Sequence, residues 1–171
     1  DRACVIQDVS WQHLFVDLIT DYVVAQAEPK GYVTVAKAAW LKDRATLEGR
    51  IDRLTCLEVL IRVIEAARWS PPTLAAFVLR QIEIDIVTGK GPLRTAATTG
   101  RGRVGKSAVE YMRRVLTGVN REDSGTITRA EAEVLLDIHD ATIASDNCVE
   151  WTELFTKAMA DLLMTASGYA G

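Results

Sequence analysis

Cysteine and histidine are scarce in this sequence. Among its 171 residues are only three cysteines (Cys4, Cys56 and Cys148) and two histidines. The cysteines are odd in number, lie far apart and form no CxxC pair, so the sequence excludes a disulfide scaffold and predicts a reducing, cytoplasmic compartment. Nothing in the spacing brings a histidine close to a cysteine, which argues against a catalytic thiol.

Long apolar runs and a strong net charge are also missing. No run approaches the roughly 18–20 apolar residues that a membrane span requires, and no basic and apolar signal peptide opens the chain. It begins with Asp1 and not with Met, so a removed leader stays open. The formal charge of −3 excludes a strongly basic nucleic-acid-binding protein. We therefore expect no membrane or nucleic-acid partner, and a protein partner remains the open class.

What the sequence does contain is amphipathic helical patterning. Hydrophobic residues make up 49% and charged residues 25% of the chain, as in a soluble globular domain. Apolar residues recur at helical spacing in seven segments. The first three cover about 9–27, 34–48 and 53–68. The next three start at Pro71, Ser107 and Thr128, and the last covers about 150–164. The sequence predicts an all-α fold of about seven helices in a compact bundle, with 53–68 as its central buried helix.

Local signals refine the helix ends. The segment 82–86 alternates isoleucine with acidic residues like a strand, but a lone strand would have no partner, so we expect helix there. Ser107 and Glu110 have the spacing of a capping box, in which a serine or threonine and a glutamate three residues later cap each other's backbone. Thr128 and Glu131 have the same spacing. We expect both pairs to open helices.

Two parts of the chain resemble each other. The segment Val9-Ser10-Trp11-Gln12-His13-Leu14-Phe15 aligns with Val149-Glu150-Trp151-Thr152-Glu153-Leu154-Phe155, and the segment 31–36 resembles 125–130. Amphipathic helices often look alike, so chance similarity stays an alternative to duplication. Duplication would give related halves at roughly 1–88 and 103–171, joined by a basic, glycine-rich loop at 89–106. Because residues 168–170 resemble 31–33, we also expect the chain to be a segment of a longer repeat protein.

The segment 120–131 carries a possible cation site. It resembles the twelve-residue calcium loop of the EF-hand family, with Gly125 at the sharp turn, Ile127 at the apolar position and Glu131 at the closing carboxylate. The resemblance implies oxygen ligands from Asn120, Glu122, Ser124, the Thr126 carbonyl and Glu131. Only two of the side-chain ligands are charged, so any calcium binding should be weak. A metal-free helix–turn–helix explains the same residues.

A second loop matches this pattern less well. The segment 26–37 places Gly31 and Val33 in register, but Lys37 stands where the closing glutamate should be, so we expect no calcium there. The short segment 48–52 is loosely similar to helical tellurite-resistance (TerB-like) domains. It is too short to imply a function.

The segment 100–107 matches GxxxxGK[ST], the phosphate loop of P-loop nucleotide-binding proteins. That resemblance implies phosphate binding through Lys106 and magnesium binding through Ser107. The P-loop fold requires several parallel strands, and this sequence offers at most one. Five basic and no acidic residues lie between 86 and 109, so this loop could instead attract an anion or an acidic partner.

Two acidic residues flank His139, at positions 137 and 140, but one histidine with carboxylates is a thin ligand set for a transition metal. A solvated acidic helix face explains them better. The sequence contains no nucleophile–base pair or carboxylate dyad in a credible context. We therefore expect a non-enzymatic helical module that acts through protein contacts, with weak calcium binding as its one candidate cofactor. The alternatives are a nucleotide-binding protein and a purely structural repeat unit.

Overall fold

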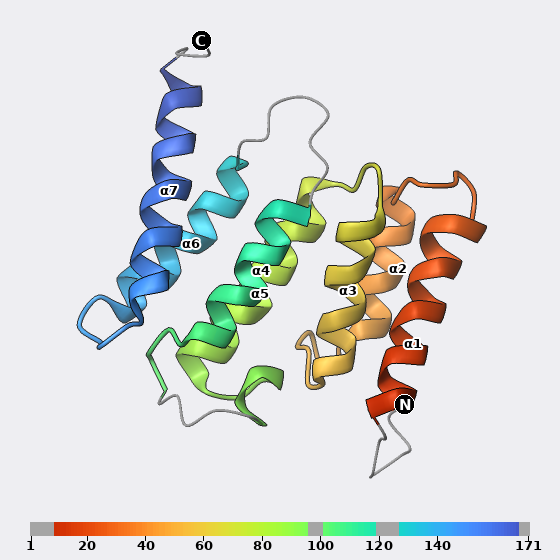
Figure 1. Ribbon diagram of the computed structural model, residues 1–171, viewed down its shortest axis with the longest axis horizontal. Helices are drawn as coiled ribbons and strands as arrows, with labels where there is room; N and C mark the ends of the chain where they lie inside the picture. The colour runs from red at the N-terminus through yellow and green to blue at the C-terminus, as the bar shows by residue number, and fades with distance from the viewer. Residues whose placement is uncertain (1–8, 96–100, 119–126, 168–171) are drawn as a thin grey trace.

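The computed structural model describes residues 9–95, 101–118 and 127–167, and these form an all-α fold, as the sequence predicts. Figure 1 shows the helices in chain order. The α-helices are α1 (Val9–Asp21), α2 (Val35–Ala45), α3 (Leu54–Ala66), α4 (Pro72–Thr88), α5 (Lys106–Gly118), α6 (Arg129–Thr142) and α7 (Val149–Ala166). A π-helical turn, η1 (Tyr22–Gln26), extends α1, and a 3₁₀ turn, η2 (Pro92–Thr95), follows α4.

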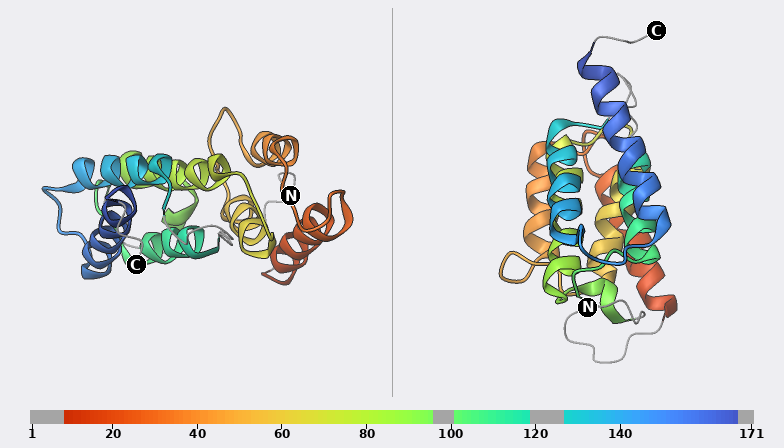
Figure 2. Two further views of the ribbon diagram at one scale, coloured as in Figure 1. Left: turned by 90° about the horizontal axis from the view of Figure 1, so that it is seen from above. Right: turned by 90° about the vertical axis from the view of Figure 1, so that its left-hand side faces the viewer.

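The helices lie in two layers. Helices α1, α3, α5 and α7 form one row, and α2, α4 and α6 lie on the other side of it (Figure 2, left). Each helix of the first row packs against the next one, α1 on α3, α3 on α5 and α5 on α7. In the second layer α4 packs against α6. The chain therefore consists of three successive helix pairs followed by α7, with α1 and α7 at opposite ends (Figure 1).

Helix α3 is the most completely buried helix of the first row. Seven of its thirteen residues are buried, and Leu60, Ile61 and Ile64 have no exposed surface. Burying one such side chain contributes about 1.5–3 kcal/mol to folding. The prediction that this segment forms the central buried helix is confirmed, and the reason is that α3 has neighbours on both sides within its row.

The helix ends confirm most of the local predictions and overturn one. Helix α4 runs through the alternating segment 82–86 and ends before Gly89, whose φ of 66° is left-handed. Thr128 and Glu131 form the predicted capping box. The predicted box at Ser107 and Glu110 is wrong: α5 already begins at Lys106, and Gly105 accepts the hydrogen bond from the Val109 amide at 3.2 Å. Ser107 is therefore inside the helix and cannot be its N-cap.

The two segments that resemble each other occupy equivalent places. Helices α1 and α7 both belong to the first row, and α2 and α6 both belong to the second layer (Figure 2). Thr34 opens α2 by accepting a hydrogen bond from the Lys37 amide, as Thr128 does for α6 from the Glu131 amide. The two pairs match at different offsets along the chain, and all odd-numbered helices share the first row, so these parallels do not distinguish duplication from chance similarity. The division at 1–88 and 103–171 stays a prediction.

The aligned helices nevertheless bury different faces. Trp11 is 45% exposed, whereas its counterpart Trp151 is 2% exposed. Exposed Leu14 and Leu18 likewise align with the buried Leu154 and Ala158. In α7 this face is covered because α7 packs against α5 and α6. None of the described helices covers the corresponding face of α1 in the way that α5 and α6 cover α7, because α1 is the first described helix of its row.

The opposite face shows the reverse pattern. Leu163 of α7 is 67% exposed, whereas the aligned Val23 is 2% exposed. Exposed Met164 likewise aligns with buried Val24. Val23 and Val24 lie in η1, which packs against α3, and α7 has no following helix among the described residues. Each end of the row therefore exposes the face that the other end buries.

No helix of the described residues is both long and apolar enough to cross a membrane.

The unequal burial of the two aligned tryptophans predicts unequal effects on stability. Trp151→Ala should lower the free energy of unfolding by about 3–5 kcal/mol, because it empties a packed site. Trp11→Ala should lower it by less than about 1 kcal/mol, because the side chain is largely in solvent. Urea denaturation followed by circular dichroism measures both. Equal losses would contradict the assignment of α1 and α7 as open and covered ends.

Candidate functional site

Of the predicted calcium loop at 120–131, the structure describes residues 127–131. Glu131 is fully buried, and its Oε2 accepts hydrogen bonds from the Thr128 amide at 2.6 Å and from the Thr128 hydroxyl at 2.8 Å. Ile127 is buried as well. The other predicted ligands, Asn120, Glu122, Ser124 and Thr126, lie outside the described residues.

Glu131 therefore already has a structural role at the start of α6. A bidentate carboxylate ligand needs both oxygens at the metal, whereas Oε2 here caps the helix. Cation binding must compete with these hydrogen bonds, which is a second reason, beside the low ligand charge, to expect weak affinity. Within the described ranges, no group of three or more histidine, cysteine, aspartate or glutamate residues is placed to hold a metal ion.

In the first loop, Lys37 occupies the third position of α2, which corresponds to the position of Glu131 in α6. Its ammonium group turns back toward the loop and donates hydrogen bonds to backbone carbonyl oxygens. The loop carbonyls thus face a positive charge that belongs to the chain itself.

The segment that resembles a phosphate loop forms ion pairs that link the start of α5 to the start of α7. The Lys106 Nζ lies 2.7 Å from Glu150 Oε1 at the start of α7, and Arg103 lies 3.3 Å from Asp146 just before it. Hydrogen bonding to Glu150 raises the pKa of Lys106, and the same bond lowers the pKa of Glu150. The lysine that would bind phosphate therefore already has a carboxylate partner.

The rest of this segment also differs from a nucleotide site. Ser107 is exposed on the first turn of α5. Arg101 donates a hydrogen bond to the Val87 carbonyl at 3.1 Å. Among the described residues there are two isolated β-bridges and no strand, so the parallel sheet of a P-loop fold has no counterpart there. Lys106 and Ser107 remain untested as a phosphate site.

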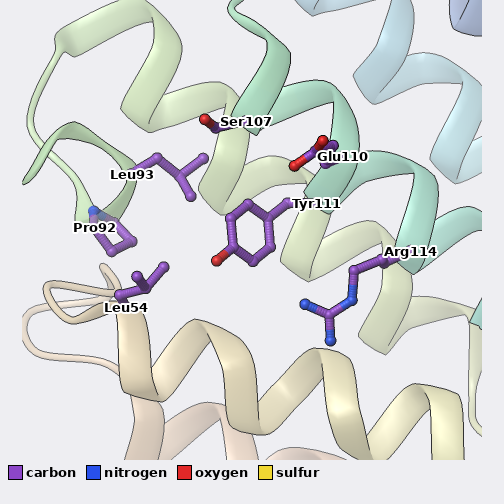
Figure 3. Close-up of a pocket in the computed structure, with 7 residues that line it drawn as sticks. All are labelled: Leu54, Pro92, Leu93, Ser107, Glu110, Tyr111 and Arg114. Atoms are coloured by element: carbon purple, nitrogen blue, oxygen red, sulfur yellow. The ribbon is translucent and has the colours of Figure 1, made fainter. Parts of the chain in front are cut away.

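A surface pocket of about 250 Å³ lies between the start of α3, the turn η2 and α5 (Figure 3). Four of its lining residues form one face of α5 at spacing i, i+3, i+4 and i+7: Ser107, Glu110, Tyr111 and Arg114. The opposite wall is apolar and consists of Leu54, Pro92 and Leu93. Figure 3 shows the Tyr111 ring between these walls and the Arg114 guanidinium directed toward α3.

Arg114 is the polar anchor of this region. Its guanidinium donates two hydrogen bonds to Glu58, at 2.7 and 2.9 Å, and two to Glu65, at 2.7 and 3.0 Å. Hydrogen bonds to Glu65 and Glu58 raise the pKa of Arg114. Burial, followed by the negative charge of Glu58, raises the pKa of Tyr111 and keeps its hydroxyl protonated. The polar groups at the pocket therefore include the neutral Tyr111 hydroxyl and the Arg114 guanidinium, which already donates hydrogen bonds to two carboxylates.

Other candidate reactive groups are also engaged in packing. Burial is the main cause that raises the pKa of the Cys148 thiol, which disfavours the reactive thiolate. His139 stacks on Phe155 with 4.3 Å between ring centroids. Its neighbour Asp137 lies 2.7 Å from Arg80, an ion pair that joins α6 to α4. The acidic face around His139 thus contributes to helix packing.

The comparisons with known proteins find no relative. No family model matches the chain, and neither the search of curated proteins nor the search of solved structures finds a significant match. Arguments about function therefore rest on the geometry of this chain.

The network around Arg114 predicts a strong effect of its removal. Arg114→Ala should lower the free energy of unfolding by about 2–3 kcal/mol, because it removes four charge-assisted hydrogen bonds from two partly buried carboxylates. The neighbouring Arg113 is exposed, so Arg113→Ala is a matched control that should change stability by less than about 0.5 kcal/mol. Chemical denaturation measures both. If the two variants lose the same stability, Arg114 does not join α3 to α5.

Proposed function

We propose that this chain is a non-enzymatic helical module that acts through protein contacts at its two ends. The observation that carries the proposal is the exposed stripe on α1 and the start of η1, which consists of Trp11, Leu14, Leu18 and Tyr22. These residues recur at spacing i, i+3, i+7 and i+11 and so share one side of the helix. A contiguous exposed apolar stripe of this kind is typical of an interaction surface.

The occupant that best fits this stripe is the far end of a second copy of the chain. Within the residues that the structure describes, no further helix covers either end of the row, and each end exposes the face that the other end buries. Helices α1 and α7 also run in the same direction (Figure 1). A second copy could therefore place its α7 against α1 and continue the row in the way that α1 packs against α3.

The charges at the two ends disfavour a contact between two α1 helices. Asp17 and Asp21 are exposed along one edge of the α1 stripe. The position of α7 that aligns with Asp17 is Lys157, the one basic residue of that helix. Two α1 helices face to face would bring only acidic residues together, whereas α7 offers one lysine beside its three acidic residues.

A second candidate function is weak calcium binding at 120–131. It is favoured by the buried carboxylate of Glu131, the twelfth residue of this segment and so the one that corresponds to the closing ligand. We propose it as an additional property of the same module. Nucleotide binding through Lys106 and Ser107 and a purely structural role remain the alternatives.

Sedimentation velocity over about 10–500 µM tests the protein contact, since small interfaces give weak, concentration-dependent association. The average mass of the wild-type chain should rise with concentration and pass beyond the dimer, because a head-to-tail contact does not close on itself. Leu18→Glu should stay monomeric. Val35→Glu is the control, because Val35 is equally apolar and exposed but lies on α2. A wild-type chain that stays monomeric throughout would contradict the proposed occupant.

Thermal unfolding with added CaCl₂ tests the calcium site. For a dissociation constant of about 1 mM, 10 mM calcium should raise Tm by about 3–5 °C. Glu131→Gln should abolish the shift while keeping the helix cap, because glutamine also serves in a capping box. Glu133→Gln, which alters an exposed acid on the same helix, should leave it intact. No shift in the wild-type chain would rule out calcium binding in this range and favour the purely structural alternative.

A further inference from the structure

The first helix–loop–helix contains a cage of backbone oxygens around one ammonium group. The Nζ of Lys37 donates hydrogen bonds to the carbonyl oxygens of Ala27 at 2.7 Å, Val23 at 2.8 Å, Tyr32 at 2.9 Å and Pro29 at 3.0 Å. An ammonium group has three N–H donors, so at least one of them is shared between two of the four oxygens. Four carbonyl dipoles that point at one place repel each other unless a cation lies between them.

The π-helical turn supplies one of these oxygens. In an α-helix the Ala27 amide would bond to the Val23 carbonyl four residues earlier. Here the Ala27 amide bonds instead to the Tyr22 carbonyl at 2.8 Å, five residues earlier, and the Gly31 amide bonds to the Val24 carbonyl at 2.6 Å. The Val23 carbonyl is thereby released from the helical ladder and accepts from Lys37.

The other end of the cage is fixed by the start of α2. Thr34 caps this helix by accepting from the Lys37 amide at 3.2 Å, so the backbone and the ammonium group of Lys37 both bond to the same loop. In the second helix–loop–helix, the same capping arrangement carries Glu131 at this position. One loop thus places a positive side chain, and the other a negative side chain, at the third residue of the exit helix.

We infer that residues 23–37 form a monovalent-cation site that is permanently occupied by the ammonium group of Lys37. Neutral carbonyl oxygens alone, with no carboxylate among these four ligands, are the donors that potassium and ammonium ions take from proteins. When the tethered ammonium group is removed and its position is left vacant, the cage accepts a free potassium or ammonium ion in its place. This site is independent of the protein contact and of the calcium loop.

Thermal unfolding of Lys37→Met tests the site, because the methionine side chain is one atom shorter than lysine, carries no charge and is flexible enough to leave the ammonium position to a free ion. In tetramethylammonium chloride, whose cation is too large for the cage, its Tm should fall by about 5–10 °C, the size expected for lost hydrogen bonds to a charged group. In potassium or ammonium chloride at the same ionic strength, about 2 °C should return, as for a weakly bound ion.

The control is Lys30→Met, which removes the exposed lysine of the same loop. Neither the control nor the wild-type chain should distinguish the salts beyond their common effect. A Lys37→Met variant that keeps the wild-type Tm would overturn the inference. So would one that loses stability equally in all salts, because Lys37 would then be a structural contact and not the occupant of a cation site.

A measurement on the wild-type chain covers the case in which the variant does not fold. Limited acylation with a dilute succinimidyl ester, read by peptide mass spectrometry, reports the reactivity of each lysine amine. Lys37 should react at least about ten times more slowly than Lys30, because its ammonium group is held by four acceptors. Equal rates at Lys30 and Lys37 would mean that the cage is not occupied and would overturn the inference.

Discussion

Every helix of a two-layer array depends on neighbours to cover its apolar surface, and this requirement explains most of the molecule. Helix α3 has α1 on one side and α5 on the other, and it is the most buried helix of its row. The same requirement is met on one side only at each end. Apolar residues remain exposed on α1 and on the last turns of α7, and they lie on opposite faces of two similar helices.

Polar contacts link neighbouring helices within each layer. Arg114 connects α5 to α3 through two carboxylates, Arg80 connects α4 to α6, and Lys106 connects α5 to α7. Each is a charge-assisted contact between helices that apolar packing has already brought together. Lys37 also makes charge-assisted contacts, but within one loop, where its partners are backbone carbonyls. Of the basic residues at 86–109, Arg103 and Lys106 likewise pair with acidic residues at or just before the start of α7.

The sequence predicts the helices well because their signals are local. The apolar period of 53–68, the prolines before α4 and the Thr128–Glu131 box each act within a few residues, and each matches the structure. The Ser107 box fails because the helix already starts after Gly105. The sequence predicts one broad apolar face on α1, but the periodicity does not reveal which of its residues pack against another helix. Phe15 and Ile19 pack, whereas Trp11 and Leu18 do not.

The candidate site is less predictable because its contacts are distant along the chain. Arg114 meets glutamates 49 and 56 residues away, and no local pattern marks such a pair. The spacing of Ser107, Glu110, Tyr111 and Arg114 on one face of α5 was the available signal for the pocket. The Lys37 cage depends on the π-helical turn, for which the sequence carries no recognised signature, although the alignment of the two loops does draw attention to Lys37.

The central claim is that the two ends of the row are complementary, and disulfide cross-linking between copies tests it most directly. In a background that lacks the three native cysteines, Tyr22→Cys and Leu163→Cys variants are mixed in equal amounts and oxidised. Both positions are exposed and lie near the same level of their helices. The account predicts that the disulfide joining position 22 to position 163 forms in clear excess over the two same-site disulfides. Equal or greater yields of the same-site disulfides would contradict it.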